Sequence, residues 1–495
     1  MKERKFFTGE KAASLVLTAA GGICLLMLLY FFYYYAWTGQ QHFANWTGAL
    51  ISYGGSALAA GLFFFALLFP SQRKINIATS LCSISFALYF FELATSIWFG
   101  LPSVLQRQNR AFLAKTAKSN GVNFDTRSKT EVVLDLRKRG IDAVLDVFPR
   151  ILLQKQSDGT FKSAIRVHGR EVLPLGGISN HVVVVCNEGG EFLTYMSDEH
   201  GFHNPPNLWG RTPPDIVALG DSYTQGWCVQ TDRNFVSEIR KRYPATLTLG
   251  IEGDGPLLEL ATLREYVKPL KPKVVLWFYF EANDLADLQT EARSPLLRRY
   301  LTDGFTQHLS TYQPELDRAL REYVEAKTDQ SALSRTLSEV STFVGDHTLS
   351  AGTISPFIKL SQLRGRLGLV FGENNVRLGG NTFSKERAGA MRPYINLFRD
   401  ILMEAKKSVS DWGGQLYFVY LPARTTYTPV AELNQERPQV LQSAMDAGIP
   451  VIDIHKTFMA RKDPLALFPF RWTDHYNDGG HRLVAEEVLR SIAVN

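Results

Sequence analysis

The hydrophobic pattern of the chain changes abruptly near residue 100. From Ala12 to Gln72 there is no Asp, Glu, Lys or Arg, a stretch long enough for two membrane crossings of ~20 residues each. We predict one crossing near Ala13–Trp37 and another near Ala49–Phe69. A third apolar run, about Ile75–Phe99, contains one charge, Glu92, which we expect to reach or pair at the membrane interface. Three such runs in succession favour membrane helices over buried core helices or a signal peptide.

Basic residues flank these runs on one side. Lys2, Arg4, Lys5 and Lys11 precede the first run, and Arg73 and Lys74 join the second to the third. The connecting segment 37–48 has no Lys or Arg. The positive-inside rule then places the N-terminus in the cytoplasm. Three crossings carry everything after about residue 100 to the outer side, as in a multi-pass protein of a bacterial inner membrane with a periplasmic domain.

Beyond the apolar runs, short strands alternate with helices. Residues 101–210 predict a polar connector and a small α/β lead-in, with a helix over Thr130–Arg139 and strands at Ala143–Leu153 and His181–Cys186. Five later strands are apolar and are separated by helices: Ile216–Leu219, Thr246–Leu249, Val274–Phe280, Leu416–Leu421 and Val451–Ile454. Continuous apolar strands predict an α/β fold in three layers, a parallel sheet with helices on both faces.

The length of 495 residues exceeds one ordinary domain. We divide the chain into a membrane region (1–100), the connector and lead-in (101–210) and an α/β domain (211–495). Between about 285 and 380 the sequence is helical and rich in charge, without a strand. This stretch predicts an insertion, either a lid over a site or a packing appendage.

Charge and cysteine content narrow the partners and the compartment. The formal net charge is +6, and Lys and Arg are scattered through the polar part, so no nucleic-acid partner is indicated. Of the four cysteines, Cys24 and Cys82 fall in membrane runs. Cys186 and Cys228 are the only pair in the exported part, where oxidising conditions favour a disulfide. Two buried free thiols are the alternative.

Candidate chemistry begins with the sequence D-I-V-A-L-G-D-S-Y-T (Asp215–Thr224). A buried strand breaks at Gly220, and a helix follows. A serine on such a tight strand-to-helix turn, here Ser222, presents its hydroxyl outward near the positive end of a helix dipole, as a nucleophile requires. The alternative is a plain helix N-cap.

Two further features follow neighbouring strands: the loop G-I-E-G-D-G-P (Gly250–Pro256) and E-A-N-D (Glu281–Asp284). The carboxyl ends of parallel strands share one edge of a sheet, where sites form. A developing oxyanion needs preorganised donors: the N–H groups of Ser222 and Gly253 and the side-chain amide of Asn283 suit that role. The alternative, when each residue is considered alone, is that Gly253 is a turn glycine and Asn283 an N-cap asparagine.

A general base comes from the C-terminal T-D-H-Y-N-D-G-G-H. His475 lies in a loop, and we expect His481 in the first turn of the last helix. Together, G-D-S-Y-T, the glycine loop, E-A-N-D and H-Y-N-D-G-G-H resemble the four blocks of the SGNH (GDSL-type) hydrolase superfamily. The resemblance covers about Asp215–Asp284 and Gln415–Asn495.

The resemblance implies a flavodoxin-like three-layer fold and esterase, lipase or acyl-transfer chemistry without a metal or cofactor. It makes Ser222 the nucleophile, Gly253 and Asn283 oxyanion donors and His475 the base. The family's aspartate, three residues before the histidine, is here Trp472. Asp474 therefore becomes the candidate acid, while a Ser–His dyad or an acid from elsewhere stays open.

We accordingly expect an extracytoplasmic serine esterase or O-acyltransferase acting on acyl, mainly acetyl, esters of envelope or exported glycans. The glycan rests on analogy with SGNH domains fused to membrane spans. Expected partners are the acylated glycan or another ester, the lipid bilayer and, for transfer, a membrane acyl-donor protein. The alternatives are a catalytically silent glycan-binding or assembly protein, and a lipase or thioesterase.

Overall fold

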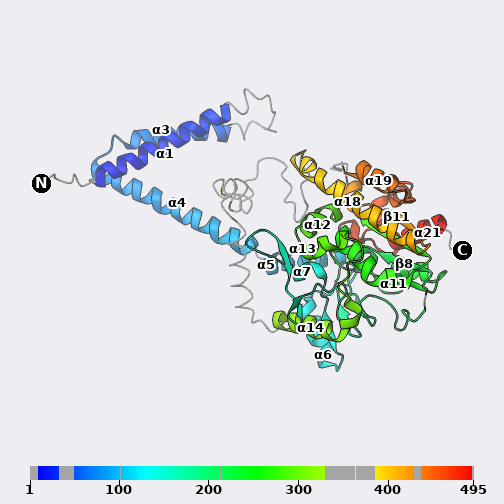
Figure 1. The fold of residues 1–495 in the computed structure, drawn as a ribbon. Coiled ribbons are helices and arrows are strands. Elements are labelled where there is room, and N and C mark those ends of the chain that lie inside the picture. The colour runs from blue at the N-terminus through cyan, green and yellow to red at the C-terminus, as the bar shows by residue number, and fades with distance from the viewer. Residues whose placement is uncertain are drawn as a thin grey trace. The chain divides into compact units, whose positions relative to one another are not determined.

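The structure is a computed structural model in which the chain divides into two compact units (Figure 1). One unit comprises residues 1–108 and 331–381, and the other comprises residues 109–330 and 382–495. The structure describes residues 9–32, 50–100, 102–211, 213–328, 360, 363, 385–428 and 436–492.

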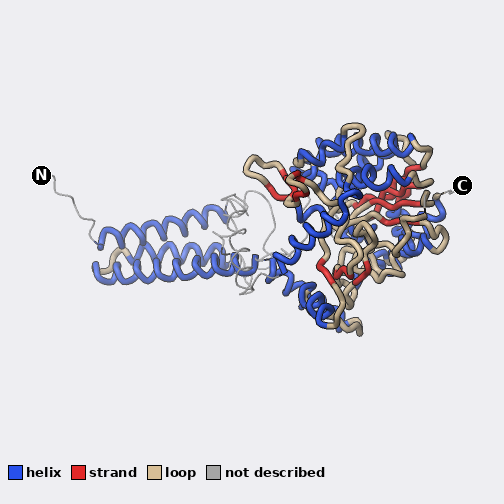
Figure 2. The backbone as a smooth tube through the Cα atoms, turned by 60° about the horizontal axis from the view of Figure 1, so that its bottom comes forward, coloured by secondary structure: helices blue, strands red, loops and turns tan. Residues whose placement is uncertain are grey.

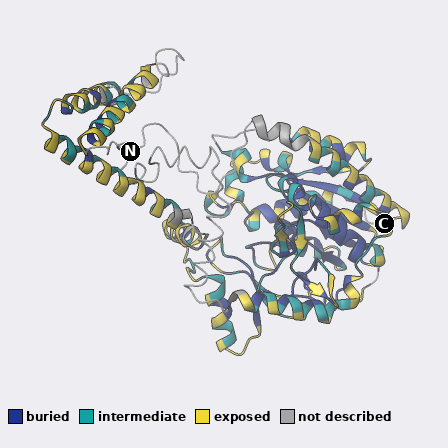
Figure 3. Ribbon diagram, turned by 60° about the vertical axis from the view of Figure 1, so that its left-hand side comes forward, coloured by how far each residue is buried: buried dark blue, intermediate teal, exposed yellow. Residues whose placement is uncertain are grey.

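The first unit is built from apolar helices. Helix α1 (Gly9–Phe32) packs against α3 (Ser56–Ala66) and α4 (Ser71–Gly100). A salt bridge of 2.9 Å between Lys74 Nζ and Glu10 Oε1 joins the N-terminal ends of α1 and α4. Large apolar side chains on these helices are exposed, and Figure 3 shows the contrast with the buried strands of the second unit. Exposed apolar surface of this kind is compatible with membrane anchoring.

Two of the described helices, rather than the expected three, are long and apolar enough to cross a bilayer: Gly9–Tyr30 and Ser71–Ser96. The run predicted as a crossing near 49–69 contains a shorter apolar helix, Tyr53–Ala66, among the described residues, and the third crossing stays a prediction. A π-helical turn, Leu50–Gly55, precedes α3, and a turn before Pro70 follows it. The π-helical turn runs directly into α3, which ends at Ala66, shortly before Pro70, a residue that helices disfavour.

The single charge in the third apolar run is satisfied within the first unit. Glu92 is buried, and its carboxylate accepts a hydrogen bond of 2.9 Å from the backbone N–H of Leu363.

The second unit contains a five-stranded sheet of order β12-β11-β10-β8-β9. All neighbouring strands are parallel, which confirms the predicted α/β fold with a parallel sheet. The strands are β8 (Ile216–Leu219), β9 (Thr246–Thr248), β10 (Val274–Phe280), β11 (Gln415–Leu421) and β12 (Val451–Asp453).

Alternate residues of each strand enter two different cores. Trp277 and Phe418 belong to one hydrophobic cluster, and Leu276 and Val419 belong to another. Each face is therefore covered, and Figure 2 shows the strands between helices. The first face carries α10 (Pro256–Thr262), α12 (Asp284–Glu291), α18 (Lys385–Asp411) and α19 (Arg437–Asp446), and the second carries α9 (Phe235–Arg240), α20 (Ile454–Met459) and α21 (Asp478–Ser491).

The lead-in shares a hydrophobic core with the large sheet. It contains a second sheet of order β1-β6-β7, and its Leu175 and Phe202 pack in the same cluster as Trp277. Its helices and strands are α5 (Pro102–Ser119), α6 (Lys129–Lys138), β1 (Ala143–Leu145), α7 (Pro149–Leu152), β2 (Leu153–Lys155), β3 (Phe161–Ser163), β4 (Arg166–Val167), β5 (Arg170–Glu171), β6 (Val182–Val184) and β7 (Thr194–Met196).

The strand predicted over Ala143–Leu153 ends at Leu145, because Pro149 begins α7, a position that proline favours. The stretch predicted as an insertion, 285–380, is described up to Thr328. It continues α12 and adds α13 (Pro295–Arg298) and α14 (Gln313–Thr328). Beyond Thr328, apart from Leu360 and Leu363, it lies outside the described residues.

Candidate active site

The turn after β8 places Ser222 at the carboxyl end of the strand, where 7% of the residue is exposed. Gly220 has φ +153°, and a Cβ there would lie 2.2 Å from Thr224 Oγ1, so only glycine fits. The short helix α8 (Ser222–Gln225) begins at once, and the Asp221 carboxylate accepts the Tyr223 N–H at 2.9 Å. The sequence thus produces the strand–turn–helix geometry expected of a nucleophile.

His475 meets this serine from the other end of the chain. Its Nε2 lies 2.9 Å from Ser222 Oγ. The loop that holds His475 is fixed on both sides: Tyr223 Oη donates to the Asp474 carbonyl at 2.5 Å, and the Asn477 side chain accepts the N–H of Gly480 at 3.1 Å. The structure therefore brings together the two residues predicted as nucleophile and base.

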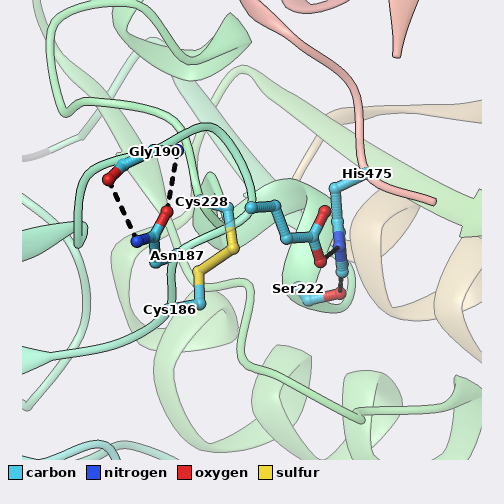
Figure 4. The surroundings of a disulfide bond; sticks show 7 residues. Cys186, Asn187, Gly190, Ser222, Cys228 and His475 are labelled. Carbon is cyan, nitrogen blue, oxygen red and sulfur yellow. Dashed lines mark hydrogen bonds and ion pairs between the residues drawn. A yellow bond between two sulfur atoms is a disulfide. The ribbon is translucent and has the colours of Figure 1, made fainter. Parts of the chain in front are cut away.

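The second ring nitrogen of His475 contacts a carboxylate from the lead-in. His475 Nδ1 lies 2.9 Å from Glu188 Oε1, so Glu188, His475 and Ser222 form a continuous hydrogen-bonded chain, as Figure 4 shows around Ser222 and His475. A carboxylate at Nδ1 holds the imidazole in the tautomer that accepts the serine proton.

Asp474, the predicted acid, does not occupy that place. Arg424 Nε donates to Asp474 Oδ1 at 3.2 Å, and the Asp474 side chain is 64% exposed. In the structure the carboxylate at His475 Nδ1 therefore belongs to Glu188 and not to Asp474.

Glu188 has no motif around it, and the nearest sequence signal was the cysteine two positions before it. Cys186 and Cys228 form a disulfide with Cα atoms 5.3 Å apart. This bond joins the Glu188 loop to the loop that follows Ser222 (Figure 4). The Asn187 side chain closes the loop further, since it accepts the Gly190 N–H at 2.8 Å and donates to the Gly190 carbonyl at 3.1 Å.

The ionised forms of Glu188 and His475 stabilise each other. Burial works to raise the pKa of Glu188, but the charge and hydrogen bond of His475 outweigh it, so that pKa lies below its ordinary value. Burial works to lower the pKa of His475, but the charge and hydrogen bond of Glu188 outweigh it and raise that pKa. The ionised pair is therefore favoured, which is the state that forms when His475 takes a proton.

The candidate oxyanion donors follow the neighbouring strands. Gly253 has φ +72°, a left-handed conformation that favours glycine, in the loop after β9. Asn283 follows β10 as the N-cap of α12, and its Nδ2 lies 3.5 Å from Asp221 Oδ2. An amide nitrogen has two hydrogens, so the second can be donated to an oxyanion.

The remaining histidines near the site have structural partners. His203 Nδ1 lies 2.7 Å from the Gln225 carbonyl, and burial lowers its pKa to about 4. His481, in the first turns of α21, accepts the Phe235 N–H at 3.2 Å. Within the described ranges, no cluster of three or more His, Cys, Asp or Glu residues has the arrangement of a metal site.

A scan against protein-family models and a search of curated proteins give no match. Among solved structures, an acetyl xylan esterase is similar at 11% identity and a TM-score of 0.29, over 56% of this chain and 99% of the esterase. A lipase/acylhydrolase from Enterococcus faecalis is similar at 13% identity and a TM-score of 0.28, over 56% of this chain and 94% of that protein. A lipolytic protein of the G-D-S-L family from Desulfitobacterium hafniense DCB-2 is similar at 14% identity and a TM-score of 0.27, over 56% and 98%. These values are too low to assign an activity, so the proposal below rests on the residues of the site.

Proposed function

We propose that the second unit is an SGNH-type serine ester hydrolase or O-acyltransferase. The observation that supports this most is the chain of two 2.9 Å contacts from Glu188 through His475 to Ser222. A serine hydroxyl is a weak nucleophile until an adjacent base takes its proton, and the base works best when a third group orients it. The three side chains match those roles.

In the proposed reaction, Ser222 Oγ attacks the ester carbonyl while its proton moves to His475 Nε2. The Glu188 carboxylate stabilises the resulting imidazolium. The N–H groups of Ser222 and Gly253 and the amide of Asn283 receive the oxyanion. Collapse of the tetrahedral intermediate transfers the His475 proton to the leaving alcohol and leaves an acyl-Ser222 ester.

The second half of the reaction regenerates the serine. His475 takes a proton from the acceptor, whose oxygen attacks the acyl-Ser222 carbonyl, and then returns that proton to Ser222 Oγ. Water as acceptor makes the protein an esterase, whereas a sugar hydroxyl makes it an O-acyltransferase. Transfer would need an acyl donor, which we assign to a membrane partner protein.

We also infer that the first unit anchors the chain in a membrane and that the second unit lies outside the cytoplasm. Lys11, Arg73 and Lys74 gather where the N-terminal ends of α1 and α4 meet. If this basic end is cytoplasmic, α4 leads the chain to the opposite side. The disulfide between Cys186 and Cys228 fits an oxidising compartment such as the periplasm.

An exposed indole three residues before His475 in the chain supports an acylated glycan as substrate. Trp472 is 45% exposed, and the Arg424 guanidinium lies 5.7 Å from its ring centre. Arg424 also binds Asp474, and Phe112 packs against the indole with ring centres 4.9 Å apart, so an aromatic surface and charged hydrogen-bonding groups lie together at the loop that carries His475. An indole offers a flat apolar surface to the C–H face of a pyranose, while the polar neighbours suit its hydroxyls.

The first experiment tests the acyl-enzyme. The full-length protein in detergent is treated with a fluorophosphonate probe, and aryl-acetate turnover is recorded. Ser222→Ala should abolish labelling and turnover, and His475→Ala should abolish turnover. Ser443→Ala, which alters another buried serine, is the matched control and should behave as wild type. A folded wild type that is neither labelled nor active would favour a silent glycan-binding protein.

The second experiment tests the substrate class. Trp472→Ala should lower the ratio of kcat/KM for an acetylated oligosaccharide to kcat/KM for an aryl acetate by about tenfold, because the smaller ester lacks a sugar ring to stack. An unchanged ratio would contradict the glycan assignment. A wild type that prefers long acyl chains to acetyl would favour a lipase or thioesterase instead.

A further inference from the structure

One face of α12 carries three polar residues at helical spacing. Asn283 is the N-cap, and Asp287 and Glu291 follow it by four and eight positions. Residues four apart lie on the same side of a helix. Each of the three is in contact, directly or through a partner, with the nucleophile turn or with the glycine loop that contains Gly253.

Glu291 holds the backbone of the glycine loop. Its Oε1 accepts the Gly255 N–H at 2.7 Å, and its Oε2 accepts the Leu257 N–H at 2.9 Å. The side chain is buried, with 2% exposure. A Cβ on Gly255 would lie 2.8 Å from Glu291 Oε1 and 2.9 Å from Asp287 Cβ, so the loop is seated directly on this face of α12.

Asp287 acts on the same loop through Arg150 of the lead-in. The Arg150 guanidinium forms an ion pair with the Asp287 carboxylate. Arg150 Cδ lies only 3.1 Å from where a Cβ on Gly253 would be. The arginine stem therefore covers Gly253 on one side, while Glu291 holds the loop two residues further on.

We propose that this face of α12 positions the oxyanion hole. Asn283 supplies a donor at the start of the helix, and Glu291 and the Arg150–Asp287 pair hold the Gly253 N–H at a fixed place relative to it. Oxyanion donors act strongly only when they are in place before charge develops. Glu291 is thus a positioning residue that acts through the loop, and this inference rests on the proposed esterase or acyltransferase function.

A neighbouring carboxyl offers a matched control. Glu259, on α10, is as deeply buried as Glu291, but neither of its oxygens accepts a hydrogen bond from the described residues. Glu259→Gln therefore makes the same chemical change without releasing a backbone N–H. In Glu291→Gln, by contrast, the new NH2 group faces one of the two loop N–H groups, so one of the two bonds is lost.

The test measures aryl-acetate kinetics and inhibition by a phenylboronic acid in wild type, Glu291→Gln and Glu259→Gln. The tetrahedral adduct of the boronic acid with Ser222 places an oxygen in the oxyanion hole. Loss of one donor typically costs about a hundred- to a thousandfold in kcat, so a displaced donor should cost about ten- to a hundredfold. We expect Glu291→Gln to lower kcat and boronate affinity by that same factor, with KM within about twofold of wild type. Glu259→Gln should change each value by less than about twofold.

A further variant covers the case in which Glu291→Gln does not fold. Arg150 is 43% exposed, so Arg150→Met should fold. It keeps an apolar stem beside Gly253 but removes the ion pair, and should lower kcat about three- to tenfold.

Folding is checked by thermal unfolding of each variant. If wild type turns over aryl acetate while folded Glu291→Gln and Arg150→Met keep its kcat and boronate affinity, the inference is wrong. If wild type is inactive, the proposed function itself fails.

Discussion

Two carboxylates lie near His475 in different loops: Asp474 is on the loop of the histidine itself, and Glu188 is on a loop of the lead-in. Asp474 is adjacent in the chain, yet its side chain is 64% exposed and pairs with Arg424. Glu188 is 287 residues away, yet its side chain is only 20% exposed and contacts the imidazole. Both loops are held in place, and the difference lies in the partner that each carboxylate contacts. The Glu188 loop is tied down by a disulfide and by Asn187, so its carboxylate stays where a proton relay needs it.

The largest effect should come from Glu188→Gln. An amide cannot stabilise the imidazolium, and it can hold the histidine in the wrong tautomer, so kcat should fall about a thousand- to ten-thousandfold. Aryl-acetate turnover of the folded variant measures this. A fall in kcat of less than about tenfold would mean that another residue orients His475, or that Ser222 and His475 act as a dyad without an acid.

Removal of the disulfide should have a smaller effect on rate and a clear effect on stability. The double variant Cys186→Ser/Cys228→Ser frees the Glu188 loop from the loop after Ser222. We expect unfolding free energy to fall by about 2–4 kcal/mol and kcat to fall about tenfold as Glu188 becomes less well placed. Denaturant unfolding and turnover test this. Cys82→Ser, at a free cysteine, is the control, and equal losses in both proteins would contradict the prediction.

The pH profile should show which carboxylate sets the basicity of His475. Because Glu188 raises the pKa of His475 above its ordinary 6.5 despite burial, turnover should fall as pH drops through a value above 6.5. The protonated pair stabilises the fold fully below pH 6.5, and this contribution is lost as pH rises through the raised pKa. In Glu188→Gln the residual acidic limb should move to lower pH, and in Asp474→Asn, whose charge is a smaller cause of the raised pKa, it should move less. If the acidic limb of the pH profile moved only in Asp474→Asn, Asp474 and not Glu188 would be the carboxylate that raises the pKa of His475.

The smallest effect should come from Asp474→Asn. The substitution weakens an exposed ion pair with Arg424, which contributes about 0–1 kcal/mol, and leaves the Asp474 carbonyl that Tyr223 contacts. We expect aryl-acetate kcat within about twofold of wild type. A hundredfold loss would show that Asp474 takes part in the chemistry after all.

Local patterns predicted much of this protein. The strand Ile216–Leu219 lies where its apolar run predicted it, and the parallel sheet followed from strands that are apolar on both faces. The turn at Gly220–Ser222 and the cap at Asn477 likewise depend on neighbours within a few residues. Such features are readable because backbone preferences and hydrophobic periodicity act over one or two turns of chain.

The tertiary structure alone decided which acid serves His475 and what holds the glycine loop. Glu188 meets His475 across 287 positions, Glu291 meets Gly255 across 36, and Arg150 reaches Asp287 from the lead-in. The sequence by itself determined the sheet and the placing of Ser222 and His475 at its edge. It could not determine these partners. The free-energy cost of closing a loop changes only slowly with its length, so the separation of two residues along the chain does not indicate whether their side chains meet.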